Sequence, residues 1–186
     1  MTRRQAWLAI CIAASAALLS AADSAGYRVN MSASMPLGLW RVTPVPPQII
    51  RGMIVVYCLG DRQMAEMALE RGYLGVGRCP TGTEPLFKPV VAVAGDFVTV
   101  TPSGIFVNGS LLTSSSPLTA DPAGRPLAGA FGEFQVSRGE VWLLSHHTTL
   151  SFDSRYSGPV RIDNITGVAY PVLTGFHRAS SPSPLP

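Results

Sequence analysis

The chain is poor in charge and has a single lysine. Charged side chains make up 13% of its 186 residues, and Lys88 is the one lysine among 14 basic residues. The net charge is +3, but the arginines are scattered and form no basic run. A protein that binds nucleic acid through its phosphates presents a basic patch or stripe. We therefore expect no nucleic-acid partner.

Helical patterns are also scarce, whereas 18 Gly and 16 Pro favour turns and short strands over a helical bundle. Residues 61–71 form one clear helical pattern, which Asp61 can cap and Gly72 can end. A long surface loop is expected at 113–135. Apolar and alternating runs predict strands at 53–57, 87–100 (two segments), 104–112 (a hairpin with an Asn-Gly turn), 141–144, 160–162 and 167–172. We predict a mostly β fold with one small inserted helical arm at about residues 58–79.

The N-terminus is an apolar segment of the kind that directs export. Arg3 and Arg4 precede residues 6–22, which carry no charge. As a helix this stretch would be about 25 Å long, short for a membrane span but sufficient for one. Ser20-Ala21-Ala22 also offers a cleavage site. A cleaved signal peptide and a membrane anchor both place the remainder outside the cytoplasm.

These patterns divide the chain into three parts. Residues 1–25 form the signal or anchor segment, and residues 26–176 form one domain. Residues 177–186, rich in Ser and Pro, form a disordered tail.

Only three cysteines are present, and two of them, Cys58 and Cys79, fall in the exported part. Outside the cytoplasm these two can form a disulfide. The bond would close a loop of about 20 residues and add roughly 3 kcal/mol to the stability. Two free buried thiols are the alternative.

Ser34 begins a segment, Ser34-Met35-Pro36-Leu37-Gly38, that suits neither a helix nor a strand. Pro36 fixes its own φ and pushes Met35 toward an extended conformation. Gly38 permits a sharp bend. The serine hydroxyl is therefore expected on a constrained turn. An ordinary surface turn is the alternative.

Lys88 lies among apolar neighbours, residues 85–87 before it and 89–91 after it. An ammonium placed there loses hydration, so its pKa should fall from about 10.4. A neutral lysine can serve as the base that a serine nucleophile needs, whereas an arginine stays protonated. A lysine that extends to water from a strand edge is the alternative.

The three histidines offer a weaker base. His146 and His147 are adjacent and would face opposite sides of a strand, and His177 lies at the edge of the tail. A Ser-His-Asp triad with Asp153 or Asp163 would lack the G-x-S-x-G signature. Metal-ligand spacings such as H-E-x-x-H are also missing. We expect neither a metal nor a cofactor.

A third polar segment runs from Ser151 to Val160 and leads into a predicted strand. Asp153 could pair with Arg155 or accept hydrogen bonds from the serines. A polar turn with a surface ion pair, worth little, is the alternative.

Together these segments form three boxes in a fixed order. They are Ser34-Met-Pro-x-Gly, then Lys88 before a Val/Ala strand and Gly-Asp, then Ser151-x-Asp-Ser-Arg-Tyr-x-Gly-Pro-Val. The combination resembles the signal peptidase I family of serine–lysine proteases, over residues 32–40, 86–96 and 151–168. The small size and the helical arm are most similar to the TraF-type conjugal-transfer peptidases. Where the wider family has Gly-Asp-Asn-x-x-x-Ser, this chain has Leu-Ser-His-His-Thr-Thr at 144–149, which favours the TraF type.

The resemblance implies a signal-peptidase-like β fold and a role for each box. Ser34 would be the nucleophile and Lys88 the general base. The backbone N–H of Ser34 and the hydroxyl of Ser32 would form the oxyanion hole. Asp153 would be a third required residue that orders the site with Arg155.

Peptidases of this type mature the pilin of a conjugative pilus by cutting near its C-terminus and joining the new end to the N-terminal amine. The resemblance thus implies a pilin precursor as substrate, with type IV secretion or mating-pair machinery as a partner. It also implies the periplasm, free or anchored to the inner membrane. Two rivals stay open: a general signal peptidase, and a non-catalytic exported β-domain scaffold of a secretion apparatus. A repressor-type self-cleaving protein fits poorly, because an export segment and not a DNA-binding helix pair precedes the domain.

Overall fold

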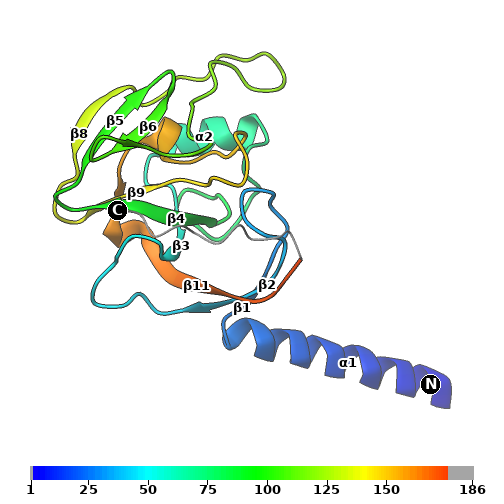
Figure 1. Cartoon of the computed structure of the whole chain (residues 1–186). Helices are drawn as coiled ribbons and strands as arrows, with labels where there is room; N and C mark the ends of the chain where they lie inside the picture. Colours follow the sequence, from blue (N-terminus) through cyan, green and yellow to red (C-terminus); the bar gives the residue numbers. More distant parts are fainter. Residues whose placement is uncertain (1, 176–186) are drawn as a thin grey trace.

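The computed structural model describes residues 2–175 and begins with a helix that projects from a β body (Figure 1). This helix, α1 (Arg3–Ser24), starts with a capping box in which the side chains of Thr2 and Gln5 bond each other's backbone N–H. None of its residues is buried. Its mean hydropathy of 1.7 and its length of 22 residues are sufficient to cross a membrane, and a signal sequence has the same properties. The tail predicted at 177–186 lies outside the described residues.

The larger sheet has seven strands, and every neighbouring pair in it is antiparallel. Its central strands are buried on both faces, which agrees with their apolar sequences. In spatial order the strands are β1 (Tyr27–Asn30), β2 (Gly38–Thr43), β11 (Ile165–Thr174), β3 (Ile54–Tyr57), β4 (Leu86–Val93), β9 (Glu140–Leu143) and β10 (Val160–Arg161).

A second, four-stranded sheet lies at the other end of the body from α1 (Figure 1). Its order is β7 (Ser110–Leu111), β6 (Gly104–Val107), β5 (Phe97–Thr101) and β8 (Gly132–Gln135). Asn108 and Gly109 turn the β6–β7 hairpin with positive φ angles of 49° and 82°, as their sequence predicts. The prediction of loop over the whole of 113–135 is wrong at its end, because β8 pairs with β5 and Phe134 packs on Trp142.

Three apolar clusters hold these layers together. The largest joins the central strands to the helical arm, the second lies between the two sheets around Trp142, and the third surrounds Trp40 and Met35 near β2. Two short helical turns, α3 (Ser154–Ser157) and a 3-10 turn at Ile162–Asn164, connect β9, β10 and β11. The predicted mostly β fold with one small helical arm and an N-terminal apolar helix is confirmed.

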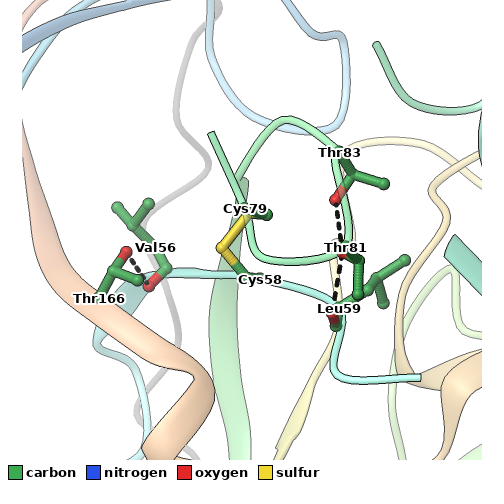
Figure 2. Close-up of a disulfide and its surroundings, with 7 residues drawn as sticks. All are labelled: Val56, Cys58, Leu59, Cys79, Thr81, Thr83 and Thr166. Atoms are coloured by element: carbon green, nitrogen blue, oxygen red, sulfur yellow. Dashed lines mark hydrogen bonds between the residues drawn. A yellow bond between two sulfur atoms is a disulfide. The ribbon is translucent and has the colours of Figure 1, made fainter. Parts of the chain in front are cut away.

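The helical arm lies between β3 and β4 and is closed by a disulfide between Cys58 and Cys79 (Figure 2). Its helix, α2 (Arg62–Glu70), begins where the Asp61 carboxylate accepts the Met64 N–H at 2.8 Å. The Thr81 hydroxyl donates to the carbonyl of Leu59 at 3.2 Å, next to the disulfide. A closed loop of this length contributes about 3 kcal/mol by restricting the unfolded chain. The disulfide therefore ties the returning part of the arm to the end of β3, the strand that pairs with the strand of Lys88.

Candidate active site

Ser34 sits on a turn between β1 and β2 that is held from both sides. The amide of Asn30, itself buried, donates to the carbonyls of Ser32, Met35 and Pro36 at 3.0–3.1 Å. These three bonds bring carbonyls from both sides of Ser34 toward one side chain, which holds the turn in one conformation. The Ser34 side chain is 7% exposed, so the ordinary surface turn is excluded.

Gly38 is the point at which this turn enters the sheet. Its φ is 139°, and a Cβ there would lie 2.1 Å from the carbonyl oxygen of Leu173 on β11. Any side chain would push β2 away from β11. The glycine is thus required for the close approach of two strands, and through it for the position of Ser34.

Lys88 lies on β4, in the middle of the larger sheet, directly opposite Val55 on β3. Its side chain is 3% exposed, which excludes a lysine that extends to water. The ammonium nitrogen donates a hydrogen bond of 2.8 Å to the hydroxyl of Ser34, 54 residues away in the sequence. The two predicted members of a dyad are thus in direct contact.

The surroundings of Lys88 favour its neutral form. The pKa of the amine is lowered from 10.5 to about 8, mainly by burial. The carboxylates of Asp153 and Glu84 raise this pKa, and the charge of Arg155 lowers it further, but burial has the largest effect. Near pH 8 about half of the molecules therefore hold a neutral amine, whose lone pair can accept the proton of the Ser34 hydroxyl.

Ser32 lies beside the dyad at the mouth of the site. Its hydroxyl oxygen is 3.0 Å from the hydroxyl oxygen of Ser34 and accepts the backbone N–H of Ser34 at 3.4 Å. Both of the expected oxyanion donors, this N–H and this hydroxyl, therefore occupy the same corner. A substrate carbonyl oxygen placed there could accept hydrogen bonds from both the Ser34 N–H and the Ser32 hydroxyl. These two bonds would replace the weak bond of 3.4 Å between the two groups.

Asp153 and Arg155 form an ion pair that is fully inside the protein, with both side chains 0% exposed. The guanidinium meets the carboxylate with two bonds of 2.9 Å. It also donates to four carbonyls at 2.7–3.4 Å, those of Ser114, Ser145, Thr148 and Thr149. The surface ion pair considered as an alternative is excluded.

Ser145 connects this pair to the nucleophile. Its N–H donates to the Asp153 carboxylate at 3.1 Å, and its hydroxyl donates a short hydrogen bond to the carbonyl of Ser34. The carboxylate of Asp153 bonds Ser145 and Arg155, so it can position the nucleophile through Ser145, and its charge also raises the pKa of Lys88. Sequence reasoning missed Ser145, although it lies where the chain departs from the wider family's motif, directly after a buried strand.

Two more buried hydroxyls, on Ser151 and Tyr57, have no hydrogen-bond partner among residues 2–175. Ser151 lines the same cleft as the dyad, and Tyr57 lies on β3 next to the strand of Lys88. Burial, and then the charge of Asp153, raises the pKa of Tyr57, so this phenol stays neutral. An apolar strand such as 53–57 gives no sign in its sequence that its tyrosine faces a charged centre.

The histidine alternative is not supported by the positions of these residues. His146 and His147 are exposed with stacked rings, and Asp163 pairs with Arg161 at the surface. His177 lies outside the described residues. Within residues 2–175, no three His, Cys, Asp or Glu side chains gather in a way that could hold a metal ion.

The dyad opens into a cleft of about 650 Å³. One wall runs from Val29 to Ser34, and the opposite wall runs from Glu84 to Lys88. The arm and the loop after β7 complete the cleft with residues such as Tyr73 and Leu118. Because the end of β1 and the start of β4 both line this cleft, an extended peptide could bind along one of these strands.

A buried serine hydroxyl bonded to a lysine amine at an open cleft is an arrangement suited to acyl transfer, the chemistry of the serine peptidases. The family model described as signal peptidase, peptidase S26, matches residues 2–173. The chain therefore belongs to the signal peptidase S26 family.

Relatives in this family support the predicted resemblance. The chain is 40% identical over 168 residues to a plasmid transfer protein TraF of Escherichia coli, covering 89% of this chain and 93% of the relative. It is also 40% identical to a probable conjugal transfer protein TraF of Sinorhizobium fredii, covering 90% and 87%. A signal peptidase I of Enterococcus faecalis matches in structure with 19% identity and a TM-score of 0.36, covering 68% of this chain and 98% of that one. The resemblance to TraF-type peptidases is thereby confirmed.

Proposed function

We propose that this protein is a Ser/Lys endopeptidase of conjugal transfer that matures a pilin precursor by cleavage and head-to-tail cyclisation. The observation that carries the proposal is the 2.8 Å contact between Ser34 and the buried amine of Lys88. The identity to proteins named for plasmid and conjugal transfer supports the biological setting.

The reaction begins with a neutral Lys88. The amine takes the proton of the Ser34 hydroxyl as the oxygen attacks the substrate carbonyl. The Ser34 N–H and the Ser32 hydroxyl stabilise the negative charge that develops on the carbonyl oxygen. Lys88 then returns the proton to the leaving amine, which departs and leaves an ester on Ser34.

The ester can be resolved by water or by an amine. Attack by the N-terminal amine of the same peptide forms an amide, and Lys88 passes the amine's proton to the departing Ser34 oxygen. Cyclisation exchanges the ester for an amide and consumes no water, whereas hydrolysis consumes one water molecule. A general signal peptidase would use water at this step, and a non-catalytic scaffold would form no ester.

The short connection between α1 and Ser34 supports the proposed location. Ser34 lies ten residues after the end of α1, which extended chain spans in at most about 35 Å. Whether α1 is retained as an anchor or removed as a signal, export places the dyad in the periplasm. A retained anchor would hold the dyad near the membrane face, where a pilin precursor and the mating-pair machinery meet.

Intact mass of the processed pilin tests the cyclisation. Cells that express the protein together with a candidate pilin precursor should yield a product one water lighter than the linear cleaved form. The precursor expressed alone is the control. A linear product of the same cleavage would support the signal-peptidase reading, and an unprocessed precursor would support the scaffold.

The pH dependence of kcat/KM is the second test. Because burial lowers the pKa of Lys88 to about 8, the neutral base is lost as the pH falls below that value. We expect kcat/KM for a peptide without titratable groups to be about 100-fold lower at pH 6 than on the plateau above pH 9. Initial rates in a buffer series of constant ionic strength measure this. A flat profile from pH 6 to 9 would contradict a lysine base.

A further inference from the structure

The substrate cleft continues past the dyad toward the helical arm. Beyond Lys88 its wall consists of Glu84, Pro85 and Leu86, and it faces Tyr73 of the arm and Leu118 of the loop after β7. A peptide held at Ser34 therefore extends along these residues if it follows the strand. The mechanism above uses none of them.

Glu84 is a fixed and unpaired carboxylate in this part of the cleft. It accepts the N–H of Gly75 at 2.9 Å, which holds it against the arm. None of the ion pairs among residues 2–175 involves Glu84. Its side chain is exposed to the cleft rather than buried, so its charge is available to a bound group.

Two other acidic or basic side chains of the described residues line the cleft, Lys88 and Asp121. The amine of Lys88 is bonded to Ser34 and is neutral in the active form of the dyad. Asp121 is buried and already accepts bonds from Tyr73 at 2.5 Å and Arg125 at 2.6 Å. Glu84 is therefore the carboxylate in the described cleft without a cation beside it. The cleft also holds the buried Ser151 hydroxyl, which has no partner among the described residues and can bond a ligand.

The distance from the dyad sets the position of any group that Glu84 binds. Four residues separate Glu84 from Lys88, at most about 14 Å of extended chain. An extended peptide beside this strand advances by about the same length per residue. The residue that reaches Glu84 is thus about three to five positions from the scissile bond.

We propose that Glu84 is a specificity residue that binds a basic side chain of the peptide substrate, three to five residues from the bond that is cut. This inference rests on the proposed peptidase function and names one feature of its substrate. Apolar surface from Tyr73 and Leu118 suits the aliphatic part of a lysine or arginine, whose charged end meets the carboxylate. The N-terminal ammonium that resolves the ester is the other source of a cation, and the test separates the two.

The test is a panel of peptides cut by the full-length protein, each with one arginine at a different position from two to six residues on either side of the bond. A peptide with norleucine at the same position is the neutral reference. We expect the ratio of kcat/KM, arginine over norleucine, to be about fivefold at one position three to five residues away. Glu84→Gln should reduce this ratio to one, and Glu84→Lys should reverse it. Acyl transfer to a free amine is measured in parallel.

Glu133→Gln, an exposed carboxylate on β8, is the matched control and should retain the preference. The ratio within one variant cancels any change in Lys88 itself. A ratio unchanged in Glu84→Gln, or an equal preference at every position, overturns the inference while leaving the peptidase in place. If Glu84→Gln alters only the amine-transfer step, Glu84 binds the incoming ammonium and the side-chain proposal is wrong. Failure to cut any peptide overturns both.

Discussion

Ser34→Ala should abolish processing, with a loss in kcat of about 10⁶-fold, because no other group can form the ester. Lys88→Arg should lose as much, since a guanidinium holds its proton at any pH used and cannot take one from Ser34. The double variant should be no worse than either single variant, because the two side chains act as one unit. Single-turnover assays with a pilin-derived peptide measure these losses.

Ser110→Ala, at an exposed serine on β7, is the control and should keep full activity. A third variant, Lys88→Met, separates loss of activity from loss of folding. It removes a buried ammonium, so the free energy of unfolding at pH 7 should rise by about 3 kcal/mol. That is the stability lost when the pKa of Lys88 falls from 10.5 to about 8 on folding. In the wild type, the free energy of unfolding should rise between pH 8 and 10.5, where the unfolded chain binds the proton and the folded chain does not. Processing by both Ser34→Ala and Lys88→Arg would refute the dyad.

Arg155→Met should lower the free energy of unfolding by about 3–5 kcal/mol, because it leaves Asp153 buried without a partner. For a chain of this size that corresponds to a fall in the melting temperature of about 10 °C. Thermal unfolding followed by circular dichroism measures it. Four carbonyls would also lose their donor.

Arg161→Met is the matched control for this change. Arg161 pairs with Asp163, but their side chains are 71% and 76% exposed, so the loss should be below about 1 kcal/mol. Equal losses in the two variants would contradict the structural role assigned to the buried pair. In Arg155→Met the rate should also fall at temperatures where the protein is still folded, since Asp153 holds Ser145 and Ser145 holds the carbonyl of Ser34.

The Ser34/Lys88 pair and the buried Asp153/Arg155 pair differ in how far the sequence predicted them. Residue chemistry made a serine before Pro36 and Gly38 and one lysine among apolar neighbours into candidates, and the resemblance carried by the three boxes together joined them as a predicted dyad. The buried pair could not be read in the same way, because Asp153-Ser-Arg155 is equally compatible with an exposed polar turn. Its burial depends on the loop at 145–149 and on Ser114, which reach it from other parts of the chain.

Local signals were sufficient where the interaction is local. Asp61 and the α2 pattern, the Asn108-Gly109 turn and the apolar strands each depend on residues within a few positions, and the structure has them where the sequence predicts. β8 shows the opposite case. Residues 132–135 have weak strand character by themselves, and pairing with β5 makes them a strand.

The sequence by itself thus determined the apolar N-terminal helix, the β-rich class and the two candidate reactive side chains, because each is marked by the chemistry of adjacent residues. Only the tertiary structure decided that Ser34 and Lys88 touch, that Ser145 joins Asp153 to the nucleophile, and that Glu84 faces the same cleft. The contacts of Ser34 with Lys88 and with Ser145 join segments that are 54 and 111 residues apart in the sequence. Burial is a property of the whole packed chain, and it is burial that lowers the pKa of Lys88.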